Sequence, residues 1–152
     1  HPLIPIGYVQ TRDAQHKKKT VNRYTPEGRA EVHKNLGVNT DTMIWLMRTP
    51  VLDKSIEFAD NRISLFAAQY GKCAISEAIL LPHDIYCHHK IPLEKGGTDS
   101  YNNLVLVTEN VHKLIHATKT DTIQKYLKLL ALTSKQLEKC NKFRTQAELP
   151  VI

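Results

Sequence analysis

Two pairs of histidines constrain this chain more than any other feature. His88 and His89 are adjacent in a short, β-prone segment, and His112 and His116 are four residues apart in a segment with helical character. Side chains four residues apart leave the same face of a helix one turn apart, so the second pair is spaced to bind one metal ion. A zinc-protease motif uses the same spacing but requires Glu directly after the first His, and here that residue is Lys113.

The first pair needs a different argument, because neighbouring residues on a strand point to opposite sides unless the strand bends. Ile91-Pro92 follow at once, so a bend is expected there. One imidazole could then complete a three-histidine metal site, while the other faces a substrate. The free imidazole would suit a general base, since its unperturbed pKa lies near neutrality.

The segment around these histidines predicts the local order strand, loop, strand, helix. The first strand is residues 85–89, and the loop contains Pro92 and Gly96-Gly97. The second strand is residues 103–107, and Thr108 or Asn110 could cap the helix that carries His112 and His116. Asn103 stands between loop and strand, where its amide could hold the loop that positions the base, or could be an ordinary turn residue.

The flanking segments have helical periodicity. Thr25-Pro26 predicts a helix start and Gly37 its end, followed by a short apolar segment at residues 43–47. Asp53 could cap a longer helix, residues 54–70. The tail predicts two further helices, the second opened by a Thr133 and Gln136 capping box. The expected buried stripe of the helix over residues 54–70 consists of Ile56, Ala59, Ile63, Phe66 and Tyr70.

The net charge of +6 is unevenly distributed along the chain. Residues 1–72 and 119–152 are basic, whereas residues 73–118 hold 3 Lys or Arg against 5 Asp or Glu and five of the eight histidines. A cationic frame around a histidine-rich centre indicates polyanion binding by the frame, although solvated lysines alone would give the same balance. Lys17, Lys18, Lys19 and Arg23 form a basic arm that could follow phosphates or act only as a tether.

Three cysteines, widely spaced and odd in number, argue against a disulfide framework and for a reducing cytosolic compartment. No apolar run approaches the length of a transmembrane helix, so no membrane association is expected. The first residue is His rather than Met, so we expect a piece of a longer protein. Cys73, His83 and Cys87 could supply three ligands to a structural zinc, but no fourth is evident; the alternative is that the cysteines are small buried residues.

Taken together, the motifs resemble the HNH nucleases, whose shared core is the ββα-metal (His-Me finger) fold. The resemblance rests on residues 87–92 (CHHKIP), 96–99 (GGTD), 102–104 (NNL) and 112–116 (HKLIH). Residues 24–29, 55–62 and 116–118 extend it to the C-terminal DNA-binding and endonuclease region of group II intron-encoded reverse transcriptase/maturases. The polymerase and most of the maturase region would lie upstream.

This resemblance implies a role for each histidine. His88, His112 and His116 would be metal ligands, His89 the general base, and Asn103 the asparagine that holds the loop. Lys90 and Lys113 join the basic arm as expected nucleic-acid contacts. The family implies Mg²⁺ or Mn²⁺ as the working ion, whereas the ligand chemistry alone favours Zn²⁺ or Ni²⁺.

The sequence therefore predicts an α+β fold, mainly helical, with a small ββα-metal core. The expected divisions are a basic arm (1–24), a helical DNA-binding region (25–71), the nuclease core (72–118) and C-terminal helices packed on it (119–152). The expected function is metal-dependent nicking of one strand of double-stranded DNA during intron mobility, in a bacterial cytoplasm or an organellar matrix, with intron RNA as a further partner of the full-length protein. The alternative is a non-catalytic nucleic-acid-binding module with a structural metal.

Overall fold

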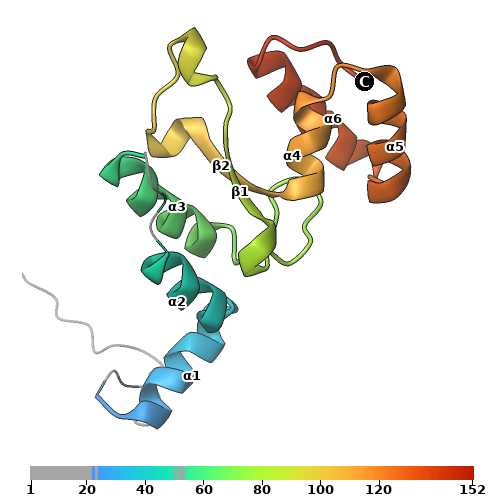
Figure 1. The fold of residues 1–152 in the computed structure, drawn as a ribbon. Helices are drawn as coiled ribbons and strands as arrows, with labels where there is room; N and C mark the ends of the chain where they lie inside the picture. Colours follow the sequence, from blue (N-terminus) through green and yellow to red (C-terminus); the bar gives the residue numbers. More distant parts are fainter. Residues whose placement is uncertain (1–21, 23, 50, 52–53) are drawn as a thin grey trace, which may run out of the picture. The chain divides into compact units, whose positions relative to one another are not determined.

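The computed structural model describes residues 22, 24–49, 51 and 54–152 (Figure 1). Within these residues the chain is mixed α+β, with six α-helices and a two-stranded antiparallel sheet. The described residues divide into two compact units, one before and one after the boundary between Gly37 and Val38. The predicted DNA-binding region, 25–71, crosses this division, because its second and third helices belong to the larger unit. No helix in the described part is both long and apolar enough to cross a membrane.

The smaller unit contains helix α1, Pro26–Leu36. It begins as its sequence predicts, with proline at the first helical position and the Thr25 hydroxyl accepting a hydrogen bond from the Gly28 amide at 3.0 Å. Gly37 follows the helix with φ of 63°, a left-handed conformation that glycine adopts without steric cost.

In the larger unit, helices α2 (Thr40–Arg48) and α3 (Ile56–Ala68) precede the sheet. Side chains cap both, since Asn39 accepts from the Thr42 amide and Ser55 accepts from the Phe58 amide. Ser55 is thus the cap of α3; the expected cap, Asp53, lies outside the described residues.

The buried face of α3 differs from the predicted stripe. Ile56 and Tyr70 are 82% and 66% exposed, and of the predicted set only Phe66 is fully buried. The buried residues of α3 are Phe58, Arg62, Leu65 and Phe66. The prediction was wrong because two sets of apolar residues, each with helical spacing, overlap on this helix. The set led by Phe58 packs against the sheet, and the first apolar residue, Ile56, lies in the exposed first turn.

The sheet is a β-hairpin of β1 (Ile85–His89) and β2 (Leu104–Thr108), joined by a long loop over residues 90–103. Two short 3₁₀ turns shape that loop, η3 (Leu93–Lys95) and η4 (Tyr101–Asn103), and a third, η2 (Pro82–Asp84), precedes β1. The outer edge of β2 is covered, because the Gln69 side chain bonds both the amide and the carbonyl of Leu106. The predicted strands are confirmed, with β2 shifted by one residue.

Helix α4 (Glu109–His116) follows β2 directly, and α5 (Thr120–Leu130) and α6 (Ser134–Gln146) complete the unit. Figure 1 shows α3 on one side of the hairpin and α4, with α5 and α6, on the other. The predicted capping box of α6 is present, with Thr133 and Gln136 bonding each other's backbone amides. The core between these layers consists of apolar side chains from both strands and the packed helices, including Phe66, Ile75, Leu80, Leu106, Val107, Val111, Leu114 and Ile115.

Candidate metal centre

Three imidazoles converge where β1 faces α4. His88, His112 and His116 each offer a ring nitrogen, and these atoms lie within 4.8 Å of one another. His88 Nδ1 is 3.2 Å from His116 Nε2, and the rings of His112 and His116 have centroids 4.6 Å apart. The three histidines predicted as ligands are therefore positioned to hold one metal ion.

The pKa values of these imidazoles are depressed. Burial, followed by the charge of neighbouring imidazoles, lowers the pKa of His88 to about 3 and of His112 to about 4. The pKa of His116 is also lowered, first by burial and then by the Arg144 charge. A metal ligand must present an unprotonated nitrogen, so the three are ready to coordinate at neutral pH.

One ring nitrogen of His88 has no hydrogen-bonding partner among the described residues. His88 is 1% exposed, and its Nε2 is buried with no hydrogen-bond partner in the described part of the chain. A buried polar atom without a partner costs about 1–3 kcal/mol. The depressed pKa values and the close spacing of the ring nitrogens fit a divalent ion with imidazole ligands.

Neighbouring elements fix the cluster in place. The Tyr86 ring stacks on His112 with centroids 5.2 Å apart, and Phe143 of α6 lies 6.1 Å from the His88 ring. The Asp84 carboxylate accepts a hydrogen bond from the Glu109 amide at 2.7 Å, so it caps α4. Thr108 was a predicted cap and occupies the cap position, but its side chain makes no capping hydrogen bond.

His89 points to the other face of the hairpin. Its Nε2 lies 2.8 Å from Asp99 Oδ1, and its ring stacks on Phe58 of α3 with centroids 5.7 Å apart and planes inclined by 19°. Because a carboxylate accepts hydrogen bonds, Nε2 carries the proton and Nδ1 carries the lone pair. The ring is therefore oriented and held in one tautomer.

Helix α3 in turn holds Asp99. The Ser55 hydroxyl donates to Asp99 Oδ2 at 2.5 Å, and the Asn61 amide donates to the Asp99 carbonyl at 2.8 Å. Hydrogen bonds from Ser55 and His89 keep the pKa of Asp99 below its ordinary value. The carboxylate thus stays charged opposite His89.

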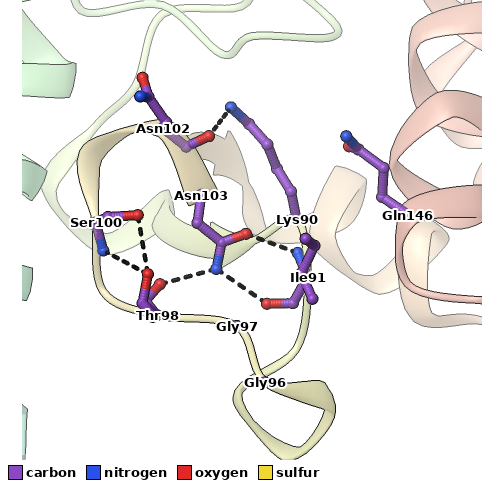
Figure 2. A pocket seen from close by; sticks show the side chains of 9 residues that line it. All are labelled: Lys90, Ile91, Gly96, Gly97, Thr98, Ser100, Asn102, Asn103 and Gln146. Atoms are coloured by element: carbon purple, nitrogen blue, oxygen red, sulfur yellow. Dashed lines mark hydrogen bonds between the residues drawn. The ribbon is translucent and has the colours of Figure 1, made fainter.

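The Asn103 side chain bridges the two ends of the loop between β1 and β2 (Figure 2). Its side-chain oxygen accepts from the Ile91 amide at 2.9 Å, and its nitrogen donates to the carbonyls of Ile91 and Thr98 at 3.0 and 2.8 Å. Gly97 packs so tightly here that a Cβ would lie 1.9 Å from the Ile91 carbonyl oxygen, and Gly96 has φ of 83°. The side chain of Asn103 therefore closes the loop that begins directly after His89.

The two faces meet in one cavity beyond the end of β1. This cavity has a volume of about 400 Å³ and is lined by His88, His89, His112 and His116 from the two faces, and by Cys87 and residues 92–95. A group bound there would lie against residues of the three-histidine cluster and against His89.

The expected nucleic-acid contacts are dispersed. Lys113 is exposed and pairs with Glu109 at 2.7 Å, one turn earlier on α4. Lys90 donates to the Asn102 carbonyl at 2.6 Å, beside the loop closed by Asn103 (Figure 2). The remaining predicted contacts, Lys17, Lys18, Lys19 and Arg23, lie outside the described residues.

The possible structural zinc site is not formed. Among the described residues, the three histidines of the cluster are the one group of potential ligands close enough to share an ion, and Cys73, His83 and Cys87 do not meet. Cys73 is buried in the core, and the exposed His83 packs edge-on against Trp45. Burial raises the pKa of Cys87 to about 12, which disfavours the thiolate that zinc requires.

Comparisons with known proteins identify no relative. No family model, curated protein or solved structure matches the chain.

Proposed function

We propose that this chain is a metal-dependent endonuclease of the HNH type, which nicks one strand of double-stranded DNA by hydrolysing a phosphodiester bond. One observation carries the proposal: a three-imidazole cluster and a carboxylate-oriented histidine line the same cavity. The antiparallel hairpin followed by α4 would then be the ββα-metal core that the sequence resemblance implies.

His89 would act as the general base. With Nε2 hydrogen-bonded to Asp99, Nδ1 can take a proton from a water molecule that attacks the phosphorus atom. The bond from phosphorus to the 3′-oxygen breaks, and the products are a free 3′-hydroxyl and a 5′-phosphate. Asp99 stabilises the imidazolium that forms, because its charge lies 2.8 Å from the ring nitrogen.

His88, His112 and His116 would hold a divalent ion. When bound, that ion would stabilise negative charge on the phosphate and on the departing oxygen. Imidazole ligands accept Zn²⁺ and Ni²⁺ readily, whereas the sequence resemblance implies Mg²⁺ or Mn²⁺ as the working ion. Asn103 would keep the loop after His89 in the geometry that places the base, and Lys90 would contact a backbone phosphate.

The finer proposal is a role in group II intron mobility. In it, this region is the C-terminal part of a reverse transcriptase/maturase, the nick supplies a 3′-hydroxyl that primes reverse transcription, and intron RNA is a second partner. The support for this role is the likeness of residues 24–29 and 55–62 to that family. A nick placed at one position of an intron-insertion target, and absent from the same DNA with a scrambled site, would support it.

A nicking assay tests the nuclease directly. Supercoiled plasmid is incubated with the full chain after chelation and after addition of Mg²⁺ or Mn²⁺. Open circles should form only with metal, and a His88→Ala variant should form none. If no divalent ion supports nicking and chelation lowers the melting temperature sharply, the cluster is a structural metal site and the protein is a binding module.

A further inference from the structure

Arg144 is an unusual residue for its position in the core. It lies on α6, its side chain is 0% exposed, and no carboxylate in the described part of the chain pairs with it. A buried charge without a counter-ion is costly unless hydrogen bonds replace its hydration. The guanidinium must therefore find hydrogen-bond acceptors within the protein.

Its hydrogen bonds converge on the end of α4. Nη1 donates to the carbonyl oxygens of Leu114, Ile115 and Ala117 at 2.8, 2.9 and 2.9 Å, and Nε donates to the Pro150 carbonyl at 2.8 Å. The last carbonyls of a helix lack partners within the helix, and a cation favours that end of the helix dipole. Arg144 therefore closes the C-terminal end of α4.

The carbonyls that Arg144 binds flank a metal ligand. His116 is the last residue of α4, between Ile115 and Ala117. Helix α4 has 8 residues, and His112 lies one turn before His116 on the same face. The residue before Arg144 contacts the third ligand, since the Phe143 ring lies 6.1 Å from His88.

We propose that Arg144 is a positioning residue of the metal centre. By bonding three carbonyls around His116, it fixes the last turn of α4, so that His116 stays within ligand distance of His88. This inference rests on the metal site of the proposed function. It predicts that the Arg144 side chain contributes to metal affinity and not only to stability.

A second buried arginine provides a matched control. Arg62 of α3 is 8% exposed, and its Nη2 donates to the carbonyls of Leu46 and Thr49 at 3.0 and 2.6 Å. These close the C-terminal end of α2, which carries none of the three histidines. Arg62 and Arg144 thus perform the same structural task on different helices.

The test compares Arg144→Lys with Arg62→Lys in the full chain. Both keep the charge and lose the planar fork, so both should lower the melting temperature. Zn²⁺ affinity measured by calorimetry should fall roughly 10- to 100-fold for Arg144→Lys, as for other residues that orient ligands, and by less than about threefold for Arg62→Lys. The visible spectrum of bound Co²⁺, which reports ligand geometry, should change only in Arg144→Lys.

Two results would overturn the inference: unchanged Zn²⁺ affinity in Arg144→Lys, or equal losses in both variants. If Arg144→Lys does not fold, an NMR titration of the wild-type chain with Zn²⁺ tests the inference instead. Zn²⁺ should then shift the Arg144 Nε–H resonance more than that of Arg62, and equal or absent shifts would contradict the inference. A wild-type chain that binds no Zn²⁺ would refute the metal site itself, which separates that failure from failure of the Arg144 role.

Discussion

The two faces of the β-hairpin place adjacent histidines in opposite electrostatic surroundings. His88 faces α4, where it meets two further imidazoles and burial lowers its pKa to about 3. His89 faces α3, where it meets the Asp99 carboxylate instead. The first arrangement favours unprotonated ring nitrogens that could coordinate a metal, and the second orients a ring through a hydrogen bond to a carboxylate.

One strand thus carries two histidines in different chemical environments. Alternation along β1 sends neighbouring side chains to different helices, and both residues line one cavity. Metal affinity should therefore depend on residues of α4, α6 and β1. The orientation of the His89 ring should depend on the loop over residues 90–103 and on α3.

The largest expected effect comes from replacing each histidine of the pair. His89→Ala should reduce the nicking rate by about 10²- to 10⁴-fold, because the base is lost, while Zn²⁺ affinity changes little. His88→Ala should abolish both. Plasmid nicking and calorimetry on the same preparations measure the two quantities, and a His89→Ala variant that lost Zn²⁺ binding would break the distinction between the faces.

The histidine cluster also predicts how stability depends on pH. The folded pKa of His88 is about 3 and the unfolded value is near 6.5, so the unfolded chain binds the proton first as pH falls. In chelator, the contribution of His88 to the unfolding free energy should be fully present above pH 6.5 and should fall by about 3 kcal/mol on acidification to pH 4.

Urea titrations of the wild type and of His88→Gln measure this effect. The difference between their pH profiles isolates His88 from the carboxyl groups that titrate in the same range. Parallel profiles for the two proteins would show that His88 is not buried in a neutral state.

On the other face, Asp99→Asn should weaken the base without weakening the metal site. The amide cannot stabilise an imidazolium as a carboxylate does, so we expect a fall of roughly 10- to 100-fold in nicking rate. Glu138→Gln removes one charge from the exposed side of α6 and serves as the control. Nicking at the wild-type rate in Asp99→Asn would mean that the carboxylate plays no part in the reaction.

A smaller effect should follow from Tyr86→Leu. Tyr86 is 38% exposed and stacks on His112, so it orients a ligand without bonding to it. Zn²⁺ affinity should fall by about threefold, on the scale of an aromatic contact worth about 0.5–1.5 kcal/mol. A change in nicking rate with unchanged Zn²⁺ affinity would assign Tyr86 to the substrate instead.

Local sequence patterns predicted the metal face well. The strand, the helix and the i,i+4 spacing of His112 and His116 depend on neighbours in the chain, so local patterns were sufficient to predict them. The choice of His88 rather than His89 as the third ligand came from the family resemblance. The same reasoning from local patterns predicted the wrong face of α3, because two sets of apolar residues overlap there and tertiary packing selects the one led by Phe58.

The contacts that were missed all join distant segments. Ser55 and Asp99 are 44 residues apart, and Arg144 is 27 residues from Ala117, so no local pattern relates them. Asp99 stood within the quoted GGTD motif without a role. The one available signal was a carboxylate in the loop that follows the base. Arg144 entered the prediction only through the basic charge of residues 119–152, although its one-turn spacing from Cys140 would have placed it on an apolar helix face.

The most direct test of the two-face account is an anomalous-scattering map from crystals of the full chain grown with Zn²⁺. The account predicts one peak, bonded to ring nitrogens of His88, His112 and His116, with His89 hydrogen-bonded to Asp99 and not coordinated. A peak that includes His89, or no peak at the cluster, would contradict it.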